Sequence, residues 1–310
     1  MQPTQPIATH PKAQPRPEVI LALGACLLAL PSVPSTRAGE PGAVASGDPA
    51  AAVTPGRVEA SDAELAKDLQ NPVADVITLP LENRVDVGPG SDWRYTMTAQ
   101  PVLPFEVTSD WMVVSRTLLS VIAAPLPAGT PDFDDPSASP IGTGPRVGGL
   151  GDLTQSFFFA PKKSDGSLIW ALGPVLRMPT ATRSSFGQGR WGAGPTGVVL
   201  RQQGAWTYGA LANQIWSFAG WGPENVNTTY LQPFLAYTTE SLMTFGAGSE
   251  AVYDWNSHEW VVPLDFTISQ LFRIGQLPLQ VGLGGRYYAE RPANGPVWGV
   301  TLTVTFMFSK

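Results

Sequence analysis

The sequence predicts an all-β fold: a transmembrane, antiparallel, up-and-down β-barrel of about 12 strands, preceded by a cleaved signal peptide and a disordered linker. Three observations predict it. The last segment alternates apolar with small polar residues, and short and long connections alternate along the chain. Charged residues make up only 14% of the 310 residues, whereas a soluble domain has about a quarter. Much of the surface is therefore expected to face something other than water.

The N-terminal leader is the first element. An apolar run covers residues 19–30, with Lys12 and Arg16 before it and a small-x-small site at 36–38 after it. So short a run cannot span a bilayer, and the order basic, apolar, cleavable predicts a secretory signal peptide over residues 1–38. A lipoprotein cleavage box ending at Cys26 and a buried core helix are alternatives that this pattern leaves open.

A linker is predicted next, over residues 39–67. From 38 to about 60 the chain is mostly Ala, Gly, Pro and Ser with scattered charge. Such a composition buries too little apolar surface to fold alone. The barrel domain is therefore expected to occupy residues 68–310.

Strand-like segments rich in Val, Thr, Phe, Tyr and Trp, separated by turn residues, fill the remainder. Their number, about twelve, is even, as single-chain bacterial barrels require. The predicted strands are 73–83, 93–105, 111–122, 152–160, 167–178, 191–201, 206–218, 228–239, 242–254, 259–272, 277–289 and 297–308.

Connection lengths support the same fold. Short connections are predicted at 106–110, 161–166, 202–205, about 240 and 273–276. Mostly longer ones fall between them, at 85–92, 123–151, 179–190, 219–227, 256–258 and 290–296, of which 256–258 is an exception as tight as any turn. Barrels of the outer membrane have short turns on the periplasmic side and longer loops outside. Both chain ends are therefore expected on the periplasmic side.

The closing strand carries the clearest alternation. Trp298, Val300, Leu302, Val304, Phe306 and Phe308 share one face, and Gly299, Thr301, Thr303 and Thr305 the other. Successive strand residues point to opposite sides. A soluble half-buried strand fits this segment alone, but threonine and glycine in place of charged residues favour a lipid-facing strand.

Aromatic residues gather at the strand ends. They are predicted to form two girdles at the headgroup level, where tryptophan prefers to lie. The long-loop girdle comprises Trp93, Trp191, Trp216, Trp255 and Trp260, and the other comprises Trp111, Trp206 and Phe308.

Ionised side chains are expected to point into the lumen, because Arg or Lys at the lipid midplane costs about 2–4 kcal/mol. This phase, with the hairpin registers, brings Glu250, Asp265 and Arg286 to one depth. The other predicted pore-lining residues are Arg94, Gln100, Arg116 and Arg177. Two interpretations stay open: a charge network that fills the interior, or a constriction that contacts solute. Charges of both signs argue against strong ion selectivity.

Other functions have little support. The net charge of −6 and the lack of a basic patch argue against nucleic acid. The two histidines, His10 and His258, lie in the leader and a tight loop, so no catalytic group is predicted. Cys26 is the one cysteine. Acidic residues at 132, 134 and 135 only partly match a calcium loop. No cofactor or metal is expected.

Several motifs resemble one family, the outer-membrane transporters filed under meta-pathway phenol degradation, over roughly residues 68–310. They are Asp68-Leu-Gln-Asn-Pro-Val-Ala, Leu79-Pro-Leu-Glu-Asn, Asp92-Trp-Arg-Tyr, Gly149-Leu-Gly-Asp, Gly173-Pro, Trp191-Gly-Ala-Gly-Pro-Thr, Trp206-Thr-Tyr-Gly-Ala-Leu-Ala-Asn and Gln232-Pro-Phe-Leu. The resemblance implies a bacterial outer-membrane barrel that passes small, often aromatic compounds, with no established site residues to carry over. Outer-membrane lipids, a small organic solute and the barrel-assembly machinery are the expected partners. A structural or surface-interaction barrel with a plugged lumen is the alternative.

Overall fold

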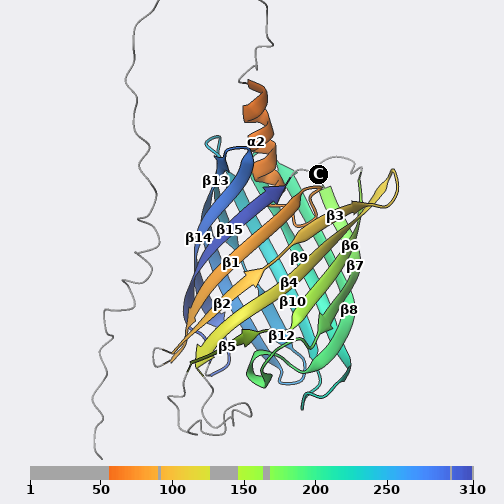
Figure 1. Ribbon diagram of the computed structural model, residues 1–310, viewed down its shortest axis with the longest axis vertical. Coiled ribbons are helices and arrows are strands. Elements are labelled where there is room, and N and C mark those ends of the chain that lie inside the picture. Colours follow the sequence, from red (N-terminus) through yellow and green to blue (C-terminus); the bar gives the residue numbers. More distant parts are fainter. Residues whose placement is uncertain (1–55, 90–91, 126–145, 163–167, 294, 309–310) are drawn as a thin grey trace, which may run out of the picture. The chain divides into compact units, whose positions relative to one another are not determined.

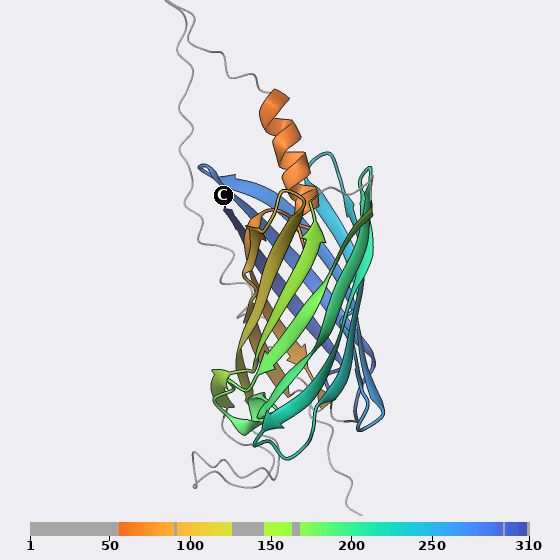
Figure 2. The same cartoon turned by 90° about the vertical axis from the view of Figure 1, so that its right-hand side faces the viewer.

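A computed structural model describes residues 56–89, 92–125, 146–162, 168–293 and 295–308. These residues form a closed, antiparallel barrel of 12 strands that tilt across the barrel axis (Figures 1 and 2). The predicted fold class is therefore confirmed. The proposed signal peptide, most of the linker and the three aspartates at 132–135 lie outside the described residues.

The 12 barrel strands comprise 15 segments, because three of the strands are interrupted. They are β1 (Ile77–Val87), β2 (Trp93–Ala99) with β3 (Val102–Glu106), β4 (Trp111–Pro125), β5 (Arg146–Leu150) with β6 (Leu153–Pro161), β7 (Leu168–Met178), β8 (Arg190–Gln203), β9 (Trp206–Gly220), β10 (Asn227–Thr238), β11 (Met243–Gly248) with β12 (Ala251–Asp254), β13 (Glu259–Ile274), β14 (Leu277–Glu290) and β15 (Trp298–Phe308). A short 3₁₀ helix, η2 (Ser184–Phe186), and the helix α2 (Gly56–Asp68) complete the described elements.

The barrel closes between its first and last strands. β1 pairs with β15 from Ile77 opposite Phe308 to Val87 opposite Trp298. β9 pairs with β10 on the other side of the circuit. Closure satisfies the backbone groups that a free strand edge would leave unpaired in lipid.

Among the described connections, the short turns lie at one end of the barrel and the longer connections at the other, as predicted. We call these the short-turn end and the long-loop end. Both Gly204 and Gly275 have a positive φ, 59° and 62°, in the turns before β9 and β14. A side chain there would meet nothing within 4 Å, so these turns require glycine for its backbone conformation rather than for space.

The outer face is apolar and carries the predicted aromatic girdles. All eight girdle residues are exposed, from Trp93 at 36% to Trp216 at 50%. Between them lie further exposed apolar side chains, among them Leu172, Phe266 and Leu283. An apolar band between aromatic rings is the exterior of a barrel that sits in lipid. The chain therefore folds as a bacterial outer-membrane protein. Among the described residues, no helix is long and apolar enough to cross a membrane.

Residues 56–67 correct one prediction, because they form most of helix α2 and not a flexible linker. Leu65 and Ala66 of α2, together with Leu69 directly after the helix end, pack against Leu271 and Met307 at the short-turn end. The overall Ala, Gly, Pro and Ser content of the upstream stretch obscured this short apolar stripe.

Two polar contacts fix α2 on the barrel. The Nε atom of Arg273 lies 2.8 Å from Oδ1 of Asp62, and Gln202 donates from Nε2 to the carbonyl oxygen of Lys67 at 2.9 Å. Figures 1 and 2 place this helix at the same end of the barrel as the end of β15.

The segment 69–76, which we call the plug segment, corrects a second prediction. The first strand was expected to begin at Val73, but β1 begins at Ile77. Val73 is only 3% exposed and packs within a cluster of inward-facing apolar side chains. The cluster comprises Met112, Val114, Phe158, Ala160, Ala171, Val198, Leu200 and Leu211. The plug segment therefore lies in the lumen near the short-turn end.

Substitution of Val73 by Asp is expected to release the plug segment and raise single-channel conductance. An unpaired carboxylate in this apolar cluster would cost several kcal/mol, which exceeds the about 1.4 kcal/mol that changes a population tenfold. Single-channel recordings in planar bilayers measure the effect. Val107→Asp is the control, since Val107 is 60% exposed in the turn before β4. Equal conductance in Val73→Asp and wild type would show that the segment does not restrict the lumen.

Candidate functional site in the lumen

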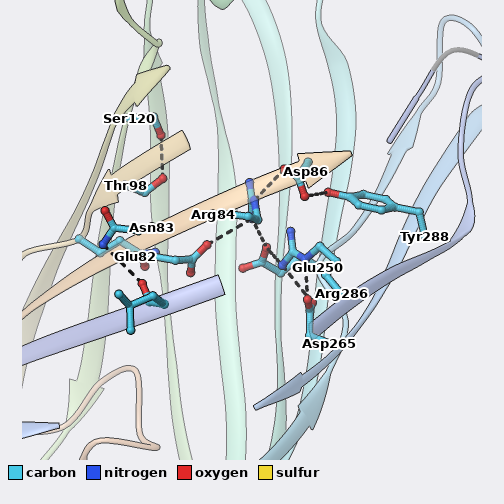
Figure 3. Close-up of polar contacts among 12 residues, drawn as sticks. Glu82, Asn83, Arg84, Asp86, Thr98, Ser120, Glu250, Asp265, Arg286 and Tyr288 are labelled. Carbon is cyan, nitrogen blue, oxygen red and sulfur yellow. Dashed lines mark hydrogen bonds and ion pairs between the residues drawn. The ribbon is translucent and has the colours of Figure 1, made fainter. Parts of the chain in front are cut away.

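Strand β1 contributes three charged residues to the lumen, at alternate positions. The guanidinium of Arg84 contacts both neighbours: Nη1 lies 3.2 Å from Oε1 of Glu82, and Nε lies 3.0 Å from Oδ2 of Asp86. Alternation along a strand puts side chains two apart on the same face, which explains the contact. Figure 3 shows the three side chains along this strand.

Arg286 on β14 holds two carboxylates. Its Nε lies 2.5 Å from Oδ1 of Asp265, and its Nη2 lies 2.6 Å from Oε2 of Glu250. The register pairs Asp265 directly with Arg286. The structure thus brings together the three residues that strand phase and hairpin register predict. Only 7% of the Arg286 side chain is exposed, so both ion pairs are largely shielded from water.

The charged residues of β1 and those around Arg286 contact each other inside the lumen. Nη1 of Arg84 lies 3.5 Å from Oε2 of Glu250, and the hydroxyl of Tyr288 donates to Oδ1 of Asp86 at 2.8 Å. We call the six ionised residues the lumenal charge cluster; they are Glu82, Arg84, Asp86, Glu250, Asp265 and Arg286 (Figure 3). Four carboxylates and two guanidiniums give it a formal charge of −2.

Half of this cluster is missing from the sequence prediction. The first strand was expected to end at Asn83, with a loop from Val85, so Arg84 and Asp86 were not assigned to the lumen. The sequence does contain a signal for a longer strand. Charged and apolar residues alternate from Arg84 to Val87, in the same phase as the residues before them. Extension of β1 to Val87 places both residues inside.

The other predicted lumenal residues divide into two groups. Gln100 and Arg116 contact each other, with Arg116 donating from Nη2 to Oε1 of Gln100 at 2.9 Å. Both border the same cavity as Arg177 and Glu250. Arg94 differs, because it is exposed near the long-loop end, opposite Asp86 in the register, and borders none of the cavities described below.

The described residues enclose at least three cavities in the barrel. The largest of these three, about 470 Å³, extends from the charge cluster toward the long loops, and its walls include Arg116, Arg177 and Tyr230. A second, about 200 Å³, lies against Asp265 and Arg286. The third, about 260 Å³, is bordered by the plug segment. Polar space thus exists on both sides of the cluster.

The last residue of α2, Asp68, brings a carboxyl group to the third cavity. Burial raises the pKa of Asp68 above its usual value, and the nearby carboxylates of Glu64 and Asp75 raise it further. This carboxyl therefore protonates at a higher pH than an exposed aspartate.

Enzymatic groups are sparse in the described residues. His258 lies in the turn between β12 and β13, where its Nδ1 is 3.4 Å from the hydroxyl of the half-buried Tyr253. Within the described ranges no three His, Cys, Asp or Glu side chains are arranged to hold a metal ion.

Comparison with known proteins supports the fold. No family model and no curated protein matches the chain. The chain is similar to the COG4313 outer membrane channel from Pseudomonas putida F1, with 14% identity, 75% of this chain and 94% of the other covered, and a TM-score of 0.56. Outer membrane phospholipase A from Escherichia coli follows, with 10% identity, coverage of 81% and 98%, and a TM-score of 0.43. The fold and the lipid-facing exterior define a bacterial outer-membrane β-barrel; the resemblance to phenol-degradation transporters stays a prediction.

Proposed function

We propose that this barrel is an outer-membrane channel for small organic solutes, aromatic compounds among them. The observation that carries the proposal is the cavity of about 470 Å³ between the lumenal charge cluster and Arg116. Its size lies within the about 300–1,000 Å³ typical of small-molecule sites. The aromatic part of the proposal comes from the family resemblance and not from the cavity.

The charged walls suit a solute path of modest ion selectivity. Arg116 and Arg177 border the cavity on β4 and β7, whereas Glu82 and Glu250 border it from β1 and the β11–β12 junction. A path lined by side chains of both charge signs excludes neither anions nor cations strongly. The net −2 of the charge cluster favours cations near its own wall.

The plug segment supports a second candidate, a structural or surface-interaction barrel with a closed lumen. Val73 and Ala74 are buried in the barrel interior, and α2 holds the segment from outside. A lumen closed by this segment would serve no transport. The two candidates predict opposite results for the same measurement.

Purified protein is expected to conduct ions in planar bilayers and to make liposomes swell in an arabinose gradient. Heat-dependent gel mobility of the same sample verifies that the barrel is folded. A folded barrel with neither conductance nor swelling would refute the channel and leave the closed barrel. Hydrolysis of phospholipid by the pure protein would instead contradict the expectation that it is not an enzyme.

A further inference from the structure

Arg116 and Arg177 border the cavity of about 470 Å³. Unlike the arginines of the charge cluster, they have no carboxylate ion-pair partner among the described residues. Arg116 donates to the neutral amide oxygen of Gln100. The Nε atom of Arg177 is buried and has no hydrogen-bond partner in the described part of the chain. Within the described part of the chain neither guanidinium takes part in an ion pair, whereas Arg84 and Arg286 each take part in at least two. Buried guanidiniums normally have an anionic or hydrogen-bonding partner.

The carboxylate whose charge acts on Arg177, that of Asp152, accepts hydrogen bonds elsewhere. Asp152 exerts a charge interaction on Arg177 without forming an ion pair. Its two carboxylate oxygens accept hydrogen bonds from backbone amides, Oδ1 from Ala181 at 3.2 Å and Oδ2 from Gln188 at 2.7 Å. Asp152 therefore does not neutralise Arg177 through an ion pair, although Arg177 borders the cavity.

The sheet places both arginines around one part of the cavity wall. β4, β6 and β7 are successive strands, with Arg116 opposite Ser156 and Thr154 opposite Arg177. Neighbouring strands lie about 4.8 Å apart, so two guanidiniums on long side chains can approach a ligand between them. The hydroxyl-bearing Ser156 and Thr154 border the same cavity. The wall thus offers two cations and two hydroxyl groups to one ligand.

Apolar side chains complete the cavity. Leu118, Leu211 and Ile215 border it beside the arginines. Four carboxylates border it as well, Glu82 and Glu250 of the charge cluster and Asp254 and Glu259 on β12 and β13. Their charge disfavours a small inorganic anion, whereas an organic anion gains from burial of its apolar body.

We propose that Arg116 and Arg177 form a binding subsite for an organic carboxylate, with the apolar body of the ligand against Leu118, Leu211 and Ile215. This inference rests on the proposed channel function and deepens it, because it assigns a chemical class to the solute. Guanidinium groups suit this role, since their planar donor fork matches a carboxylate in a bidentate arrangement.

Benzoate, with benzamide as its neutral counterpart of equal shape, tests the subsite in planar bilayers at pH 7. Benzoate is expected to reduce the potassium current in a saturable manner, and benzamide is expected to have little effect. Arg177→Gln and Arg116→Gln are each expected to raise the half-blocking concentration of benzoate about tenfold or more. Arg177→Lys retains the charge and is expected to lose less. Lys162→Gln removes a positive charge outside the lumen, where Lys162 pairs with Glu106, and is the control.

The outcomes separate this inference from the channel proposal. Sulfate, a small inorganic anion, is the third compound tested. If the wild type conducts but benzoate blocks no better than benzamide or sulfate, the carboxylate subsite is overturned and the channel proposal stays intact. Absence of conductance in the folded wild type would overturn the channel itself, and the subsite with it. If the glutamine variants do not show heat-dependent mobility, the wild-type comparison of the three compounds decides. Block by sulfate equal to that by benzoate would show an inorganic anion site only, which contradicts the role of the apolar wall.

Discussion

Deletion of residues 306–310 is expected to abolish the folded barrel in the outer membrane. The deletion removes the residues that pair with Ile77, Thr78 and Leu79 of β1, and it also removes the partner of Leu279 on β14. Each backbone group left unpaired in lipid costs several kcal/mol. A few such groups match the whole stability of a folded domain, about 5–15 kcal/mol.

The same deletion removes an apolar contact at the short-turn end. Met307 is 1% exposed and packs with Ala66 of α2 and Leu271 of β13. Its loss therefore also weakens the position of the helix that precedes the plug segment. Strand closure and helix docking therefore depend on the same three residues, Phe306, Met307 and Phe308.

Membrane fractionation and gel mobility before and after boiling measure this effect. Wild-type protein is expected in the membrane fraction with heat-dependent mobility, and the deletion variant is expected to be depleted at least about tenfold. A variant that lacks only residues 309 and 310 is the control, because β15 ends at Phe308. Normal amounts of heat-modifiable barrel after the longer deletion would refute the assignment of the closing strand.

Replacement of Arg286 by Ala is expected to raise cation preference and to destabilise the barrel. The change takes the charge cluster from a formal −2 to −3 and leaves Asp265 without its 2.5 Å ion pair. Glu250 keeps only the longer contact to Arg84, at 3.5 Å. Removal of one partner from a shielded ion pair costs about 3–5 kcal/mol, because the remaining charge is left uncompensated.

Reversal potentials in a potassium chloride gradient test the selectivity. The cation-to-anion permeability ratio is expected to rise about twofold in Arg286→Ala, since field effects are strong in a narrow low-dielectric passage but salt screens them. Glu250→Ala and Asp265→Ala are expected to shift the ratio the other way. Arg286→Lys keeps the positive charge but loses the planar donor geometry of the guanidinium, so it shows whether selectivity depends on the charge or on that geometry.

Stability is measured on the same variants by the temperature at which heat-dependent mobility is lost. Arg286→Ala is expected to lower this temperature more than Arg286→Lys does. Three alanine variants with intact conductance and wild-type selectivity would mean that the cluster does not face the ion path. The cluster would then be a charge network that fills the interior, the interpretation that the sequence leaves open.

Periodicity and turn spacing decided most of the fold. The period of two along each strand determines which side chains face lipid and which face the lumen. The positions of the strand ends determine the number of strands and the two aromatic girdles. Both are local properties of the chain. The contact of Arg286 with Asp265 and Glu250 followed as well, because neighbouring strands joined by short turns have a register that the turn sets. Local rules suffice where sequence neighbours are also spatial neighbours.

The first strand shows where such rules stop. Its predicted start at Val73 and its end at Asn83 were each wrong by four residues, since β1 covers Ile77–Val87. Val73 is apolar because it packs in the lumen and not because it lies in a strand. A single apolar residue carries no signal that separates these two environments.

The sequence by itself determined a 12-strand barrel of the outer membrane, its lipid-facing side chains and the inward phase of its charges. Only the tertiary structure decided how the lumen is used: it placed α2 and the plug segment at one end and joined Arg84 and Asp86 to the charge cluster. It also left Arg116 and Arg177 without an ion-pair partner among the residues that the structure describes. The physical reason is sequence distance. Tyr288 contacts Asp86 across 202 residues and Arg273 contacts Asp62 across 211, and such contacts depend on closure of the whole barrel, which no local pattern encodes.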